Sequence, residues 1–436
     1  MSSVPQISGN AANAANALAL VDTKDIVKSW SEETIYECSK HINKLCDIRT
    51  LSSLSKHFFL VVFNDKFPRW QTLLTSHFPT SFQLALPIAQ PIACYKHLKT
   101  INDQFKAGTY QTTTIDAHPS HASFLTIQDG KLISGSSSDR SISIWDLKSG
   151  ELQFKVPLNH QQEMTCLEVK GKTFFSGSND RTIKIWDFEK GEMLHKLEGH
   201  QAAIVALKES DGKLISTSMD QQIKVWDIAS GKLLQTLVNS NGVSSRFIIV
   251  KDGKFICDSF KSINICDLQS GKLISSIGTD HKSSICHLEA QDGKIISTGN
   301  DGIIKIWDFE TGTLLHTLDK HQGSISTLLA NDGKLISASD DCTIKIRDLE
   351  SGQELHSLSG HAKWITCLSI KDGMIISGSF DRTIKIWDLE SGQLFRTLEG
   401  LESYPVNLQV KDERLVAGLV NGKIKIFDFT PPSKNR

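Results

Sequence analysis

Histidine, serine and aspartate recur together along this chain, and these three residue types form the nucleophilic site of many hydrolases. Five stretches contain all three at nearly constant offsets, and in each a tryptophan follows the aspartate by six residues. The five sets are His118/Ser134/Asp139/Trp145, His160/Ser176/Asp180/Trp186, His200/Ser216/Asp220/Trp226, His281/Ser297/Asp301/Trp307 and His361/Ser377/Asp381/Trp387. Five copies of one nucleophilic site are not expected in a single chain, and the sequence contains no G-x-S-x-G turn to present a catalytic serine. We therefore interpret the sets as structural, and we predict that the protein is not an enzyme.

Composition gives little support to other chemistry. The nine cysteines form no C-x-x-C pair, and the sequence has neither a Walker loop nor an H-E-x-x-H motif, so we expect no metal and no cofactor. The formal net charge of −1 gives no electrostatic reason to expect nucleic acid or a membrane as a partner. The longest apolar run near the N-terminus, Ala17–Val21, is too short for a secretory signal, so a cytoplasmic, reducing location is expected.

The sets belong to a longer repeat that must position them. Eight copies each end in a residue pair whose second member is aspartate, and the first members are 40 or 41 residues apart. These first members are Trp145, Trp186, Trp226, Cys266, Trp307, Arg347, Trp387 and Phe427. In one copy, runs rich in branched residues at 203–207, 213–218, 223–227 and 232–237 are bounded by Gly, Asp or Asn turns, which is typical of four short strands.

A period of about 40 residues that ends in Trp-Asp resembles the WD-repeat family. The resemblance implies an all-β eight-bladed propeller over residues 107–430, with the recurring His, Ser, Asp and Trp as the structural tetrad of that family. Pro431-Pro432 blocks the outer strand of the last repeat, which leaves 431–436 as a tail. We predict that Tyr110–Ile115 supplies the missing strand and closes the ring.

Three copies depart from the tetrad. The fourth has Asn241, Cys257 and Cys266 in place of His, Ser and Trp, and its shorter turn lacks the Asp; the sixth has Arg347 in place of Trp; the eighth has Leu401, Ala417, Asn421 and Phe427. We expect blades 4 and 8 to open first, because lost networks lower local rigidity. We expect Arg347 to pair with a nearby carboxylate.

The segment before the repeats has a different pattern. Residues 1–21 are rich in Ala, Asn and Ser and are expected to be disordered. In residues 22–80 the sequences Trp30-Ser-Glu-Glu-Thr-Ile-Tyr-Glu-Cys-Ser-Lys-His-Ile42 and Asp47-Ile-Arg-Thr-Leu-Ser-Ser-Leu-Ser-Lys-His-Phe58 resemble an F-box, although that family usually begins with Leu-Pro where this chain has Trp30-Ser31. The resemblance implies a small all-α domain followed by a helical linker at 81–106. It also implies that an SCF-type adaptor is bound through Ile35, Ile42, Leu51 and Leu54; an ordinary amphipathic cap is the alternative.

Partners of WD-repeat proteins mostly bind the face that carries the d–a and b–c loops. Three positions in each blade are expected there: the third and fifth residues after the His and the residue before the turn Asp. The unusual residues at these positions are Glu163, Met219, Arg246, Asp340, Trp364, Phe380 and Tyr404. The three aromatics lie on blades 7 and 8 and could form one patch, unless they are partly buried at the central channel.

Two functions follow from these patterns. The chain is predicted to be a protein-interaction adaptor, most simply the substrate-recognition subunit of an SCF-type ubiquitin ligase, with an unknown target protein or peptide on the propeller. A WD-repeat scaffold without a ubiquitin-ligase link is the alternative. Because a phosphate cage needs several guanidinium groups and only Arg246 occupies one of the three positions, an apolar or mixed peptide is preferred over a phosphopeptide. Arg140, Arg181 and Arg382 follow the turn Asp and are expected to pair with local carboxylates.

Overall fold

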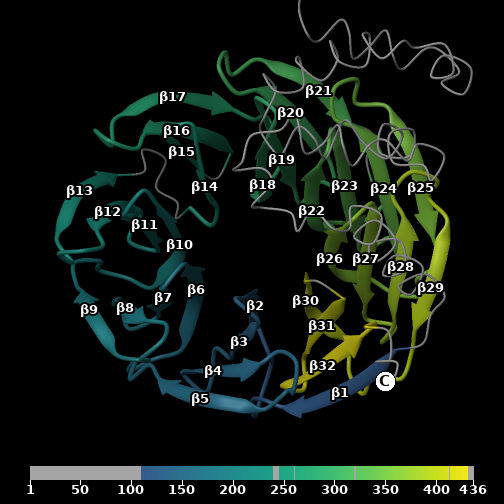
Figure 1. Ribbon diagram of the computed structural model, residues 1–436. Helices are drawn as coiled ribbons and strands as arrows, with labels where there is room; N and C mark the ends of the chain where they lie inside the picture. The colour runs from purple at the N-terminus through teal and green to yellow at the C-terminus, as the bar shows by residue number, and fades with distance from the viewer. Residues whose placement is uncertain (1–109, 239–244, 260, 319–320, 412, 431–436) are drawn as a thin grey trace, which may run out of the picture. The chain divides into compact units, whose positions relative to one another are not determined.

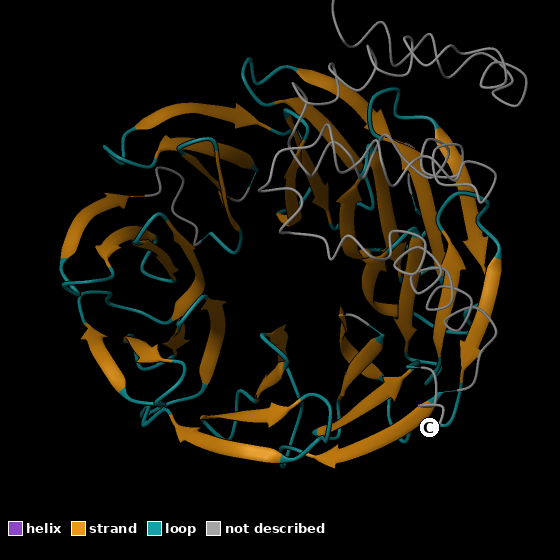
Figure 2. Ribbon diagram, in the orientation of Figure 1, coloured by secondary structure: helices purple, strands orange, loops and turns teal. Residues whose placement is uncertain are grey.

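A computed structural model describes residues 110–238, 245–259, 261–318, 321–411 and 413–430. The predicted disordered terminus, F-box-like domain, linker and tail, together with Asn241, lie outside these residues. Within the described ranges all regular structure is β-strand, and no helix has the length and apolarity that a membrane span requires. The described chain forms the antiparallel sheets drawn in Figure 2.

Each sheet has four strands and is one blade, numbered in chain order from the innermost strand outward. Blade 1 contains β2 (Phe124–Gln128), β3 (Lys131–Gly135), β4 (Ser141–Asp146) and β5 (Leu152–Pro157); blade 2 contains β6 (Met164–Lys170), β7 (Thr173–Ser178), β8 (Ile183–Asp187) and β9 (Met193–Leu197); blade 3 contains β10 (Ile204–Ser210), β11 (Lys213–Ser218), β12 (Gln222–Asp227) and β13 (Leu233–Val238); blade 4 contains β14 (Ile248–Lys251), β15 (Lys254–Ser259), β16 (Ser262–Asp267) and β17 (Leu273–Gly278).

The remaining blades repeat this order (Figure 1). Blade 5 contains β18 (Ile285–Gln291), β19 (Lys294–Gly299), β20 (Ile304–Asp308) and β21 (Leu314–Leu318); blade 6 contains β22 (Ile325–Asn331), β23 (Lys334–Ser339), β24 (Thr343–Asp348) and β25 (Glu354–Ser359); blade 7 contains β26 (Ile365–Lys371), β27 (Met374–Ser379), β28 (Ile384–Asp388) and β29 (Leu394–Leu398); blade 8 contains β30 (Pro405–Lys411), β31 (Arg414–Leu419), β32 (Lys423–Asp428) and, from the start of the chain, β1 (Gln111–Asp116).

The hairpin between the two innermost strands explains why this sequence forms sheets. In six blades an Asp-Gly pair makes the turn, as at Asp129-Gly130, where φ is +48° and +71°. Positive φ at both central residues defines the tight turn whose twist matches antiparallel strands, and Asp and Gly tolerate this backbone best. The turn therefore sets the register between the two innermost strands of these blades.

The hydrophobic core lies between blades. In the described residues the buried side chains form eight clusters, and each cluster joins two neighbouring sheets. One cluster joins Leu132 and Trp145 of blade 1 to Val416 and Ile424 of blade 8. Because blade 8 also shares a cluster with blade 7, the sheets form a closed ring without an uncovered blade face. This confirms the predicted eight-bladed propeller.

The predicted closure is also confirmed. Strand β1 pairs antiparallel with β32, with Gln111 opposite Asp428 and Ile115 opposite Ile424. Just before β1, the Tyr110 ring packs 5.6 Å from the Phe427 ring, and the Arg396 guanidinium of blade 7 lies 4.8 Å from the Tyr110 ring centre. The first described residues therefore hold the two ends of the repeat array together.

Deleting residues 111–116 tests the role of closure. The deletion removes the β1–β32 ladder and the buried Ile115, so we expect a loss of unfolding free energy on the order of 5 kcal/mol, measured by urea denaturation. Deleting residues 431–436 is the matched control and should leave stability unchanged. An equally stable deletion of 111–116 would show that β1 does not close the ring.

Candidate functional site

Blade 7 shows the tetrad geometry in full. The carboxylate of Asp381 can only accept, so His361 donates from Nδ1 to Asp381 Oδ2 at 2.9 Å, and Ser377 donates to His361 Nε2 at 2.8 Å. Trp387 Nε1 donates to the same serine oxygen at 2.9 Å. The backbone N–H of Ala362 also donates to Asp381, at 2.9 Å. The network therefore ties the d–a loop to the b–c turn on one face of the blade.

The arrangement resembles a hydrolase triad, but no substrate can reach it. All six serines that bond a tetrad histidine have no exposed surface: Ser134, Ser176, Ser216, Ser297, Ser337 and Ser377. Burial lowers the pKa of His361 and outweighs the opposing effect of Asp381, so the imidazole stays neutral. The tetrads are structural, as the sequence predicted, and no enzyme family is indicated for the chain.

A recurring backbone hydrogen bond brings two of the three predicted target positions together. The N–H of the residue before the turn Asp donates to the carbonyl of the third residue after the His position. Five blades make this bond: Asn179 to Glu163, Met219 to Ala203, Asp340 to Ser324, Phe380 to Trp364 and Val420 to Tyr404. The b–c turn and the d–a loop therefore present adjacent side chains in each of these blades, on the face defined here as the top face.

Three of the predicted target residues form one patch. Phe380 of blade 7 lies between Trp364 of the same blade and Tyr404 of blade 8. The Trp364 and Phe380 ring centres are 5.8 Å apart at 82°, and the Phe380 and Tyr404 centres are 4.0 Å apart at 29°. Phe380 and Tyr404 are half-buried by this stacking, whereas Trp364 is 55% exposed. We call these three residues the aromatic patch.

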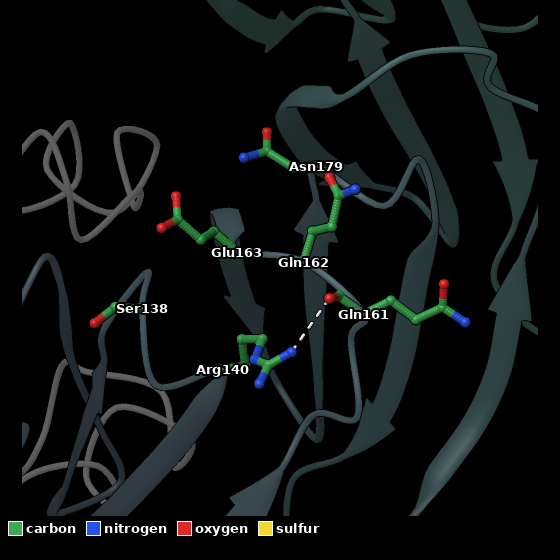
Figure 3. A pocket seen from close by; sticks show the side chains of 6 residues that line it. All are labelled: Ser138, Arg140, Gln161, Gln162, Glu163 and Asn179. Carbon is green, nitrogen blue, oxygen red and sulfur yellow. Dashed lines mark hydrogen bonds between the residues drawn. The ribbon is translucent and has the colours of Figure 1, made fainter.

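The other predicted target residues lie on blades 2, 3, 4 and 6. Glu163 is exposed and lines a shallow polar pocket of about 380 Å³ with Ser138, Arg140, Gln161, Gln162 and Asn179 (Figure 3). Met219 is 62% exposed, and Asp340 is half-buried with a pKa raised by that burial and by the adjacent Asp341. The predicted set is therefore spread over the top face, and its largest apolar side chains gather on blades 7 and 8.

Arg246 is held at the junction between blades 4 and 5. Its Nη2 donates to the carbonyl of Ile285 at 2.6 Å, and its backbone N–H donates to Asp258 Oδ1 at 2.7 Å. Asp258 also accepts from the Phe247 N–H at 2.8 Å. Burial raises the pKa of the Asp258 carboxyl and outweighs these hydrogen bonds and the Arg246 charge, which lower it. Sequence reasoning missed Asp258. The signal was available, because the corresponding position of the other blades has Gly, Thr or Ala and only this strand has a charged residue there.

The prediction that the three turn arginines pair with carboxylates is not supported. Arg140 donates to the carbonyl oxygens of His160 and Gln161, at 3.2 Å each. Arg181 and Arg382 are exposed, and neither forms an ion pair with a residue in the described ranges. A backbone carbonyl is the better partner for Arg140 because the nearby turn carboxylate, Asp139, already bonds the tetrad histidine at 2.7 Å.

In blade 6, Arg347 replaces the tryptophan and remains buried. Its Nη2 lies 3.3 Å from Glu354 Oε2, which also accepts from Lys345 at 2.8 Å. Its Nη1 lies 3.5 Å from the oxygen of Ser337, so the guanidinium occupies the place of the indole N–H. The expected carboxylate partner of Arg347 is confirmed.

Comparisons with known proteins agree with this geometry. The family model described as "WD domain, G-beta repeat" matches residues 109–146, 153–187, 191–227, 271–308, 312–348 and 352–388, just over half of the chain. Residues 228–270 and 389–430, which no match covers, contain the incomplete tetrads of blades 4 and 8. The crystal structure of the computationally designed Ika8 protein is similar, with 34% identity and a TM-score of 0.68 over 72% of this chain and 98% of that chain. No curated protein matches the chain significantly.

Acid should destabilise the propeller in two stages. Burial lowers the pKa of five tetrad histidines below 6.5, so the unfolded chain binds more protons and stability falls as pH drops through their folded pKa values. Burial would raise the pKa of Asp180, Asp341 and Asp381, but hydrogen bonds outweigh it and lower each pKa to about 2. Stability therefore falls a second time as the pH drops below 3.8, the usual pKa of these carboxyls. Urea midpoints measured from about pH 8 to about pH 3 should therefore decrease steadily below pH 6.5, and a flat profile down to about pH 5 would contradict the buried neutral histidines.

A double-mutant cycle tests the Arg347 substitution for tryptophan. Glu354→Ala should cost about 1–2 kcal/mol of unfolding free energy, because it removes the carboxylate from a buried guanidinium. In an Arg347→Trp background, which restores the residue of the complete tetrads, Glu354→Ala should cost less than about 0.5 kcal/mol. Equal costs in the two backgrounds would show that Glu354 does not act through Arg347.

Proposed function

Since the chain belongs to the WD-repeat family, in which the propeller is an interaction scaffold, we propose that it is the substrate receptor of an SCF-type ubiquitin ligase. In this function the N-terminal segment binds the adaptor through Ile35, Ile42, Leu51 and Leu54, and the top face binds the target. The receptor performs no chemical step; it raises the local concentration of the target near the transferring subunits. The proposal places the chain in the cytoplasm.

The observation that carries target binding is the aromatic patch. Most large apolar side chains of the propeller are buried between blades, yet Trp364 keeps more than half of its surface exposed beside two further rings. Clustered exposed aromatics of this kind are the usual anchors of protein interfaces, because they bury large areas at low cost in side-chain entropy. The patch therefore supports the binding of a protein or peptide on blades 7 and 8.

The ligase part of the proposal is supported by the N-terminal sequence. The stretches 30–42 and 47–58 resemble an F-box, and an F-box followed by a helical linker and WD repeats is the arrangement of known SCF substrate receptors. A scaffold without a ubiquitin-ligase link is the second candidate. It is favoured by the Trp30-Ser31 pair, which departs from the usual start of the F-box.

Co-purification of the full chain with an SCF adaptor distinguishes the two. The wild-type protein should retain the adaptor, and the double variant Ile35→Lys/Leu51→Lys should lose it while its thermal unfolding midpoint stays the same. Trp364→Ala is the matched control on the top face and should retain the adaptor. Failure of the wild-type chain to bind any SCF adaptor would contradict the ligase function and leave the scaffold.

A further inference from the structure

Two exposed cations lie in the same loop and turn as two residues of the aromatic patch. Lys363 immediately precedes Trp364 in the d–a loop of blade 7, and Arg382 lies two residues after Phe380 in the b–c turn of the same blade. Both side chains are exposed, and within the described ranges neither is joined to a carboxylate. Since the Phe380 N–H bonds the Trp364 carbonyl at 2.9 Å, the loop with Lys363 and the turn with Arg382 lie side by side.

Two carboxylates in the same loops and turns of blades 7 and 8 are already engaged, whereas a third, Glu399, is exposed and forms no ion pair with a described residue. Asp381 accepts from His361 at 2.9 Å and from Thr383. Burial would raise the pKa of Asp381, but hydrogen bonds outweigh it and lower this pKa to about 2. On blade 8, Glu402 pairs with Lys423 at 2.6 Å. Neither Asp381 nor Glu402 is therefore free to pair with Lys363 or Arg382, which lie in the same loop and turn as Trp364 and Phe380.

We propose that the aromatic patch binds a linear segment of the target in which a phenylalanine, tryptophan or leucine is flanked by aspartate or glutamate. This inference rests on the proposed target-binding role of the top face and specifies the chemistry of the target. The apolar side chain packs on the exposed Trp364 ring and the edges of the Phe380–Tyr404 stack. The flanking carboxylates pair with Lys363 and Arg382, which adds attraction over long range and fixes the direction of the segment.

The geometry does not favour a phosphate group as the flanking anion. Tight phosphate recognition uses several guanidinium groups with convergent donors. Here the ammonium of Lys363 and the guanidinium of Arg382 belong to two different loops of blade 7. The Arg246 side chain is held by the Ile285 carbonyl, and its backbone N–H is held by Asp258 of blade 4. Two separate cations suit two separate carboxylates better than one phosphate.

Fluorescence anisotropy with labelled short peptides tests the inference on the full chain. The probes share a central phenylalanine and differ in their flanks, which are glutamate, serine, lysine or phosphoserine; a fifth probe has alanine at the centre between glutamates. The glutamate-flanked phenylalanine peptide should bind most tightly, and raising the salt concentration should weaken it. Trp364→Ala should weaken it by more than about tenfold, and Lys363→Glu/Arg382→Glu by roughly tenfold.

Two control variants separate these effects from general changes of the top face. Arg181→Glu reverses an exposed arginine at the same turn position of blade 2, where φ is +72° against +63° at Arg382. Leu234→Ala removes an exposed apolar side chain from the outer strand of blade 3, away from the predicted target positions. Neither change should alter the affinity for the glutamate-flanked peptide, and the thermal unfolding midpoint of every variant is measured beside its affinity.

The outcomes separate this inference from the proposed function. Equal affinity for all flanks, or a preference for lysine or phosphoserine flanks, would overturn the acidic specificity while leaving target binding at the patch intact. Loss of binding in Arg181→Glu as large as in Lys363→Glu/Arg382→Glu would overturn the assignment to blade 7. If no peptide binds although the SCF adaptor is retained, the inference fails and the ligase function stands.

Discussion

The structure depends on one constraint: a four-stranded blade has two apolar faces and can bury them only against its neighbours. All eight core clusters of the described residues join adjacent sheets, so a stable array must return to its beginning. The pairing of β1 with β32 meets this requirement by uniting the first described strand with the last repeat. Tyr110 supports the same junction through Phe427, Phe429 and the Arg396 guanidinium.

Inside the ring, unlike residues perform the same function. Complete tetrads fasten the d–a loop to the b–c turn through a buried His–Asp pair, whereas blade 6 replaces the indole by the Arg347 guanidinium. Blade 8 replaces the tetrad by apolar packing around Phe427, and blade 4 anchors its loop through Asp258. Because these solutions all hold the loops, the top face can vary in side-chain chemistry without loss of the scaffold.

The fold was largely readable from the sequence because repetition multiplies a weak signal. The period of 40 or 41 residues, the tetrads and the closing strand near Tyr110 all follow from comparing one repeat with the next. Contacts between different blades cannot be read in this way. The sequence predicted that Phe380 and Tyr404 share one patch, but it did not predict that their rings stack. The partners of Arg246 and Arg140 are backbone carbonyls, whose positions no sequence pattern specifies. The F-box-like segment stays a prediction, since it lies outside the described residues.

Hydrogen exchange of the full chain, followed by mass spectrometry, tests ring closure most directly. If β1 is an integral strand of blade 8, the hydrogen-bonded amides in 111–116 should be as protected as those in the outer strands of the other blades, and they should become exposed together with 423–428 as denaturant is added. Exchange of 111–116 at the rate of an open strand, while 423–428 remains protected, would show that the ring is stable without closure and would contradict the account.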